Sequence, residues 1–192
     1  MGQTLSRRTL GGMLAAIGAT TVTGVSAQDG TPVATPLSGV ATGIDGVAGG
    51  GTLSQMGVKV PFSFMAFSVP GLDGQPVVGG FMRLVDDSTL NHPLVIEATE
   101  IVSVQPLSPR STTGRQVTGW GTLNMHGHYP FMLQVDDLGE PGSGEDTFNL
   151  VFGEAALPFL TGEDKSGCDC GGLGYAIRSN VTSGDLSVIE AP

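Results

Sequence analysis

Four side chains with metal-binding chemistry occur in two short motifs. His126 and His128 flank a single glycine, and Cys168 and Cys170 flank a single aspartate. Two imidazoles and two thiolates form a tetrahedral donor set that suits zinc or copper. Because residues i and i+2 of a straight strand share one face, each pair can chelate. The spacing therefore predicts a small metalloprotein that binds zinc or copper through these four residues.

A second interpretation joins the two cysteines in a disulfide. The Cα atoms of alternate strand residues lie about 6.6–6.8 Å apart, at the upper edge of disulfide geometry, and a bent loop shortens that distance. Glycines surround the Cys-Asp-Cys motif and favour such a bend, and an exported protein favours oxidation. A hairpin turn at the glycine between His126 and His128 would also make the two imidazoles diverge. Both interpretations remain open at this point.

An acidic segment is the second candidate metal site. It gathers five carboxylates within eleven residues, interrupted by glycines: Asp136, Asp137, Glu140, Glu145 and Asp146. Calcium takes six to eight oxygen ligands from flexible loops, so this composition predicts a calcium site. The spacing matches neither an EF-hand nor a nonapeptide calcium repeat. The alternative is a hairpin loop whose carboxylates face solvent.

Signatures of common enzyme classes are missing from the sequence. It contains no G-x-S-x-G nucleophile elbow, H-E-x-x-H motif, P-loop or G-x-G-x-x-G motif. The absence of these motifs favours a non-enzymatic binding or structural module, whose ligand is an unidentified protein or surface group. A hydrolase with an unrecognised site is a further alternative.

The elements that carry these residues are predicted to be strands. From Gly49 onward, apolar residues alternate or form short β-branched and aromatic runs between glycines and prolines. One helical turn is expected at Glu154–Leu160. This pattern predicts a single all-β domain over residues 49–192, an antiparallel β-sandwich or barrel. The expected strands are Thr52–Gln55, Val58–Val69, Val77–Val85, Leu94–Val104, Gln116–Asn124, Tyr129–Val135, Thr147–Phe152, Leu173–Arg178 and Asp185–Ile189.

An internal echo divides this domain into two halves. Residues 49–62 and 119–131 both contain G-x-G-T-L, then a glycine, then Pro-Phe. The echo predicts two hairpins of the same build, with Gly57 and Gly127 at positive φ in their turns. The other glycines of the echo, at 49–51, 119 and 121, are also expected at turns.

Several of these segments resemble a known family. They are similar to the post-COAP-type β-rich domains of secreted bacterial proteins. The similar segments are Gly49–Leu53 with Phe62–Ala66, the strand Leu94–Val104, and Val135–Gly142 followed by Asp146–Phe148. The resemblance covers most of the chain after residue 48. It implies a secreted, non-catalytic β domain, and it supplies no catalytic residues.

The N-terminal region predicts export. Arg7 and Arg8 precede the apolar run Leu10–Val25, and a small-residue cleavage site ends at Ala27. Residues 1–27 therefore resemble a twin-arginine signal peptide, with an ordinary Sec signal as the alternative. Residues 28–48 are rich in Pro, Thr and Gly and are expected to form a linker. The expected location is periplasmic, cell-surface or extracellular, with no membrane anchor after cleavage.

Composition excludes some classes of binding partner. The 192 residues include 31 glycines and carry a formal net charge of −10. Removal of residues 1–27 leaves six basic and eighteen acidic residues, which gives a charge of −12. An acidic surface repels nucleic acid, so a nucleic-acid partner is excluded. The 40% hydrophobic content also excludes a wholly disordered chain.

Overall fold

The computed structural model describes residues 43–88, 92–160 and 162–190. These residues form eight antiparallel strands that close into a barrel, in which each strand pairs with the next and β8 pairs with β1. The predicted all-β architecture is confirmed. The elements are β1 (Asp45–Gln55), β2 (Val58–Pro70), β3 (Pro76–Asp86), β4 (Leu94–Pro106), β5 (Gly114–Leu123), β6 (His126–Asp136), β7 (Thr147–Gly153), the 3-10 helix η1 (Glu154–Phe159) and β8 (Gly174–Glu190).

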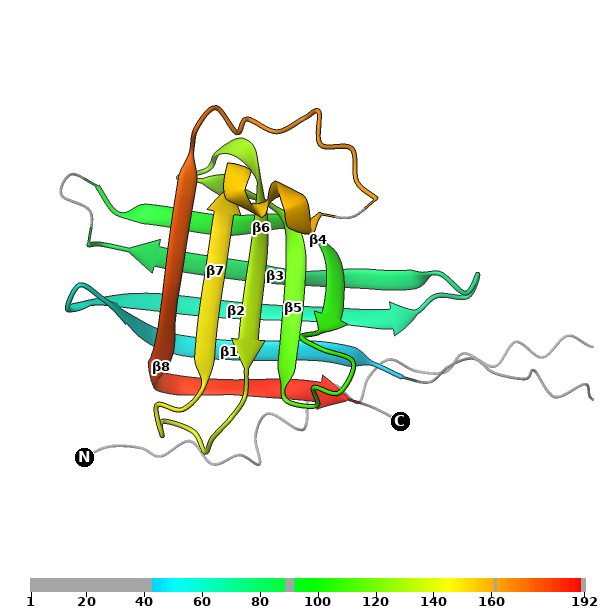
Figure 1. Ribbon diagram of the computed structural model, residues 1–192, viewed down its shortest axis with the longest axis horizontal. Coiled ribbons are helices and arrows are strands. Elements are labelled where there is room, and N and C mark those ends of the chain that lie inside the picture. The colour runs from blue at the N-terminus through cyan, green and yellow to red at the C-terminus, as the bar shows by residue number, and fades with distance from the viewer. Residues whose placement is uncertain (1–42, 89–91, 161, 191–192) are drawn as a thin grey trace, which may run out of the picture. The chain divides into compact units, whose positions relative to one another are not determined.

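The barrel is flattened into two layers of strands that cross each other. In Figure 1, β5, β6, β7 and the first part of β8 run upright, whereas β1, β2, β3 and the last part of β8 run across them. β8 belongs to both layers, because its first half pairs with β7 and its second half pairs with β1. Gly184, at φ 107°, and a register shift between Thr52 and Leu53 allow this corner. Bulges and bends of this kind let strands change layers.

The barrel interior is a packed apolar core. Alternation along each strand sends every second side chain inward, and these side chains come from all eight strands. Aromatic rings form its centre, with the ring centroids of Phe62 and Phe148 4.7 Å apart. Burial of this apolar surface is the main favourable contribution to folding.

Most glycines of the echo lie within strands, which corrects the prediction that they form turns. Residues 49–51 belong to β1, and residues 119 and 121 belong to β5. A Cβ atom on Gly51 would lie 1.9 Å from the Ser183 carbonyl oxygen, and one on Gly119 would lie 2.1 Å from the Glu100 carbonyl oxygen. These positions therefore require glycine because the neighbouring backbone approaches closely where the sheet curls.

Both echoing segments form hairpins as predicted, β1–β2 and β5–β6, but only the first has its glycine in the turn. The β1–β2 turn is Met56 and Gly57, with φ of 51° and 80°, whereas the β5–β6 turn is Asn124 and Met125, with φ of 50° and 65°. Gly127, at φ 77°, lies within β6, which corrects the prediction that it forms the turn. Each hairpin opens one half of the barrel, β1 to β4 or β5 to β8.

Two strand assignments differ from the sequence-based prediction. β1 begins at Asp45, inside the segment assigned to the linker 28–48, because the glycine-rich start of this strand has no strong strand signal. The last two predicted strands are one continuous strand, β8. The predicted helical turn is present as η1. The predicted signal peptide, and the linker up to residue 42, lie outside the described residues.

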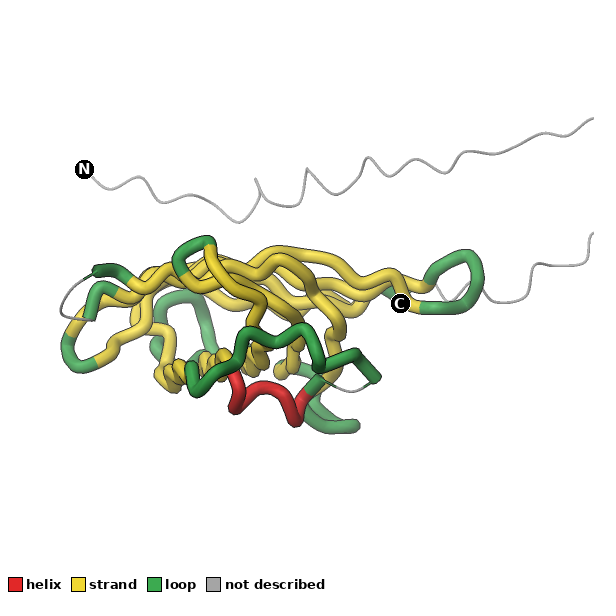
Figure 2. The backbone as a smooth tube through the Cα atoms, turned by 90° about the horizontal axis from the view of Figure 1, so that it is seen from above, coloured by secondary structure: helices red, strands yellow, loops and turns green. Residues whose placement is uncertain are grey.

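A second, smaller core lies on the outside of the barrel. η1 contacts β6 and β7, and Figure 2 shows it outside the strand layer. Trp120 and Met132 point away from the barrel core, yet they are only 3% exposed, and Ala156 and Leu160 are fully buried. We call η1 and the described part of the loop that follows it, residues 154–160 and 162–173, the outer flap.

No helix in the described ranges is long and apolar enough to cross a membrane.

Arg115 links a strand in the middle of the sequence to the first and last strands of the barrel. Its side chain on β5 is 1% exposed, and it donates hydrogen bonds to Asp45 Oδ1 at 2.5 Å and to Glu190. Burial lowers the pKa of Arg115, but the two carboxylates raise it more, and the net pKa is above its ordinary value. The guanidinium therefore stays charged and links β1, β5 and β8.

Candidate functional site

A row of polar side chains crosses the outer face of the upright strands. Gln116 on β5, Gln134 on β6, Asn149 on β7 and Arg178 on β8 are register partners of one another in turn. Their sequence neighbours, such as Leu133 and Leu150, point inward and are buried. Antiparallel pairing places residues that are directly opposite on the same face of the sheet, so these four side chains form one continuous row.

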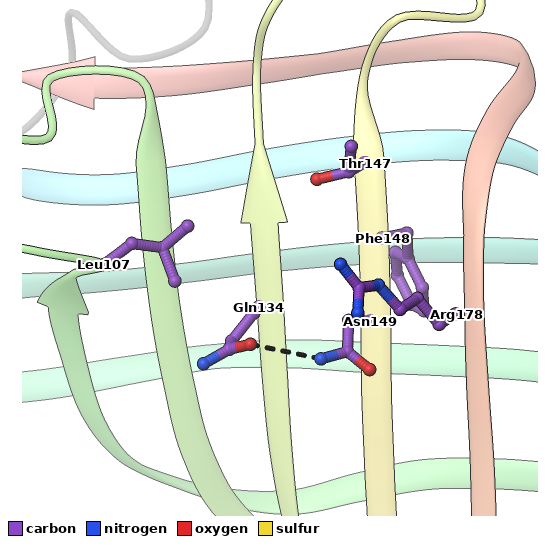
Figure 3. A pocket seen from close by; sticks show the side chains of 6 residues that line it. All are labelled: Leu107, Gln134, Thr147, Phe148, Asn149 and Arg178. Carbon is purple, nitrogen blue, oxygen red and sulfur yellow. Dashed lines mark hydrogen bonds between the residues drawn. The ribbon is translucent and has the colours of Figure 1, made fainter.

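Three amides in this row are connected by hydrogen bonds with a defined direction. Gln134 Nε2 donates to Gln116 Oε1 at 3.0 Å, and Asn149 Nδ2 donates to Gln134 Oε1 at 3.1 Å (Figure 3). Asn149 Oδ1 is the last atom in this series of hydrogen bonds, and it accepts no hydrogen bond within the described part of the protein. An acceptor therefore remains open beside Arg178.

A groove of about 210 Å³ follows this row. It is lined by Leu107, Gln134, Thr147, Phe148, Asn149 and Arg178. Phe148 is fully buried and belongs to the floor, whereas Leu107 lies in the loop between β4 and β5 and supplies an apolar wall. Figure 3 shows Arg178 extending over β7 beside Asn149. The groove therefore combines a cation, amides and a hydroxyl with one apolar side.

The guanidinium of Arg178 has no carboxylate partner among the described residues. The buried Arg115 has two partners, and Arg83 pairs with Glu97 at 3.0 Å. An exposed, unpaired arginine presents planar donors that match a carboxylate in two-point geometry. In a chain with a net charge of −10, this residue is a local site of attraction for an anion.

A second depression is larger but carries balanced charge. It measures about 400 Å³ and lies over the outside of β3 and β4, lined by Arg83, His92, Pro93, Val95, Glu97, Asn124 and Met125. The ion pair between Arg83 and Glu97 satisfies the opposite charges within it. It therefore offers less attraction for an anion than the groove at Arg178.

The structure brings the His-Gly-His and Cys-Asp-Cys motifs together through the backbone. The backbone N–H of His128 donates to Asp169 Oδ2 at 2.8 Å, and the backbone N–H of Asp169 donates to the His128 carbonyl at 3.0 Å. The His128 ring stacks on Trp120, with centroids 4.2 Å apart. His128 therefore anchors the outer flap to the barrel.

The same geometry does not assemble the predicted zinc or copper site. Cys168 and Cys170 form a disulfide with each other, as the second interpretation expects. A register shift follows Gly121 and pairs His126 with Leu123, a residue that packs against the core. His128 instead lies on the outer face, where its ring stacks on Trp120. The bulge thus breaks the two-residue alternation that chelation requires. Within the described ranges, no group of three or more His, Cys, Asp or Glu side chains could hold a metal.

The acidic segment uses carboxylates to hold its own loop. Asp146 is 3% exposed and accepts hydrogen bonds from the backbone N–H groups of Leu138 and Gly139 at 3.0 and 3.1 Å. Asp136 accepts a hydrogen bond from the Thr113 hydroxyl at 2.6 Å. Asp136 and Asp146, which are proposed calcium ligands, therefore have structural partners within the protein. The geometry lends no support to the calcium prediction at Asp136, Asp137, Glu140, Glu145 and Asp146.

The sequence analysis missed a buried polar pair at one end of the barrel. Asp86, the last residue of β3, is fully buried and accepts hydrogen bonds from the Tyr175 hydroxyl at 2.9 Å and the Ser88 backbone N–H at 2.8 Å. Burial raises the pKa of Asp86, but the hydrogen bonds from Ser88 and Tyr175 outweigh it and the net pKa is lowered. Burial, with the contact to Asp86, raises the pKa of Tyr175. The only signal for this pair was the sequence Val-Asp-Asp, which occurs at residues 85–87 and again at residues 135–137.

The sequence analysis also missed the polar row, because its members are far apart in the sequence and only strand register aligns them.

No family model, curated protein or solved structure matches this chain, and the resemblance to post-COAP-type domains stays a prediction.

Proposed function

We propose that this protein is a non-enzymatic binding module that acts outside the cytoplasm and holds a carboxylate-bearing ligand in the groove at Arg178. The observation that carries this proposal is the unpaired guanidinium of Arg178 beside the open acceptor of Asn149. The six lining residues include no His, Cys, Asp or Glu, so the groove offers binding groups without a nucleophile and base pair. The signal-like N-terminal sequence supports the location.

The lining favours a ligand that carries both a carboxylate and hydroxyl groups. Arg178 can donate two parallel hydrogen bonds to a carboxylate, and Asn149 Oδ1 can accept one from a neighbouring hydroxyl. Thr147 adds a hydroxyl, and Leu107 adds an apolar contact. A uronic acid unit of an oligosaccharide combines these groups.

The size of the groove indicates that it holds one unit of a longer ligand. Pockets that enclose a whole small molecule measure roughly 300–1,000 Å³, and this groove measures about 210 Å³. An acidic oligosaccharide lying across the upright strands would place one uronate at Arg178 and extend beyond the groove at both ends.

The proposal is tested by calorimetric titration of the protein with a uronate oligosaccharide and with its neutral counterpart. We expect binding of the acidic form alone, with an affinity that falls as salt concentration rises. Arg178→Gln should weaken binding by about tenfold or more, since a charged hydrogen bond contributes about 1.5–3 kcal/mol.

The matched control is Lys59→Gln, which removes the same charge from an exposed position on β2 that does not line the groove. It should leave the affinity unchanged. Equal binding of the neutral oligosaccharide, or equal affinity of Arg178→Gln and the unmodified protein, would refute the proposal.

A further inference from the structure

The disulfide in the outer flap closes an unusually short loop. Cys168 and Cys170 are separated by one residue, and their Cα atoms are 5.0 Å apart. A disulfide stabilises a fold mainly by restricting the unfolded chain, and this effect grows with the length of the loop that it closes. A bond that encloses only Asp169 therefore adds little to the stability of the folded protein.

The flap is held in place by contacts that do not involve the sulfur atoms. Asp169 exchanges two hydrogen bonds with the His128 backbone, and the Leu173 N–H donates to the Cys170 carbonyl at 2.8 Å. The Glu154 N–H in turn donates to the Leu173 carbonyl at 3.1 Å. None of these hydrogen bonds uses a sulfur atom, so reduction of the disulfide removes none of the groups that form them.

The two cysteines differ in their access to solvent. Cys170 is 9% exposed, whereas Cys168 is partly exposed and follows an exposed run over residues 162–167. Thiol–disulfide exchange requires access to one sulfur atom, and its direction depends on which sulfur is attacked. An external thiolate can reach Cys168 first.

We infer that Cys168 and Cys170 form a thiol–disulfide exchange site that oxidises a dithiol on an extracytoplasmic protein or peptide. A thiolate of the donor attacks Cys168 Sγ, the bond between the two cysteines breaks, and Cys170 Sγ leaves and takes up a proton. The second thiolate of the donor then attacks the donor's other sulfur atom, which is bonded to Cys168 in the mixed disulfide. A disulfide forms within the donor, and Cys168 Sγ leaves and takes up a proton. The donor gains a disulfide, and the protein gains two electrons and two protons as two thiols.

This activity uses residues separate from the groove, so it does not depend on ligand binding at Arg178. The test uses the oxidised full chain, treated with dithiothreitol at neutral pH without denaturant. The reaction is stopped with acid, free thiols are alkylated, and their number is measured by mass. We expect both cysteines to be reduced in the folded protein at a rate within about tenfold of that in denaturant.

Two single variants test the order of attack. In Cys170→Ser, the remaining Cys168 should form a mixed disulfide with oxidised glutathione. In Cys168→Ser, the buried Cys170 should react at least about tenfold more slowly. Equal rates in the two variants would contradict the assignment of Cys168 as the attacked sulfur.

The double variant Cys168→Ser/Cys170→Ser separates an exchange site from a structural crosslink. Its melting temperature should stay within about 4 °C of that of the oxidised protein, because the closed loop is so short. A fall of about 10 °C or more, a native disulfide that resists dithiothreitol until the protein unfolds, or two free thiols under oxidising conditions would each overturn the inference.

Discussion

At the scale of single residues, the chemistry of this protein depends on whether each charged side chain has a partner. Among the described residues Arg178 has no carboxylate partner, and it lines the groove, whereas Asp86 is fully buried and held by the hydroxyl of Tyr175 and the backbone of Ser88. A buried carboxylate with donors stabilises the fold only while it is ionised. Asp86 therefore makes stability depend on pH, and Arg178 is available for binding.

Replacement of Asp86 tests this dependence on pH. The folded-state pKa of Asp86 lies below its ordinary value near 3.8. Its contribution is therefore present above that ordinary value and is lost as the pH falls through the folded pKa. Asp86→Asn should lower the free energy of unfolding at pH 7 by about 1–3 kcal/mol. Urea unfolding at several pH values should show a shallower acid loss than in the unmodified protein.

Tyr175→Phe supplies the complementary measurement. Folding raises the pKa of Tyr175 above its ordinary value of 10.0. The neutral hydroxyl therefore stabilises the folded protein at pH values below 10, and this contribution is lost as the pH rises from 10 through the folded-state pKa. The phenylalanine variant should lack this alkaline component. An Asp86→Asn variant with an unchanged acid profile would contradict the role of the pair.

At the scale of elements, the outer flap is a separable layer on the barrel. Its helix η1 contacts β6 and β7, its residues Ala156 and Leu160 are fully buried, and Trp120 and Met132 on the outer faces of β5 and β6 are only 3% exposed. This small cluster is separate from the main core. A layer with few buried contacts opens at lower free energy than the barrel beneath it.

Leu160→Ala should open the flap without unfolding the barrel. Removal of a buried leucine costs about 2–5 kcal/mol, and here the loss falls on the smaller cluster. Trp120 is the only tryptophan in the chain, so its fluorescence reports directly on the covered surface. We expect emission at longer wavelength and faster quenching by acrylamide, while the far-UV spectrum of the strands is retained.

Leu72→Ala is the matched control, because Leu72 is fully exposed in the turn between β2 and β3. It should change neither the emission wavelength nor the quenching. Loss of the strand spectrum in Leu160→Ala would mean that the flap and the barrel unfold as one unit.

At the scale of the whole molecule, closure of the barrel depends on contacts between distant parts of the chain. Arg115 in the middle of the sequence contacts Asp45 at the start of β1 and Glu190 at the end of β8. The side chain of Arg115 is 1% exposed, whereas those of Asp45 and Glu190 are 36% and 55% exposed. The cost of breaking the cluster should therefore depend on which partner is removed.

Arg115→Met should be the milder change. It leaves two carboxylates that can turn into water, and we expect a loss of about 1–3 kcal/mol in the free energy of unfolding. The double variant Asp45→Asn/Glu190→Gln leaves a buried, uncompensated guanidinium and should lose about 3–5 kcal/mol. Guanidinium chloride titrations compare the two, and a greater loss in Arg115→Met would refute this asymmetry.

Local patterns in the sequence determined most of the strand residues and the turn at Gly57. Runs of apolar residues identified part of every strand in the described residues, and Gly57 adopts the positive φ that its turn requires. These features depend on near neighbours in the chain, and backbone sterics and side-chain burial act at that range.

Register and closure could be decided only by the tertiary structure. Gln116, Gln134, Asn149 and Arg178 form one row only because three turns and loops set the alignment of four strands. A shift of one residue in any strand would send its member of the row into the core. The bulge that separates His126 from His128 has the same origin. The sequence by itself determined most of the residues that form strands, and the folded barrel decided which of them meet, because pairing partners are fixed by contacts far apart in the chain.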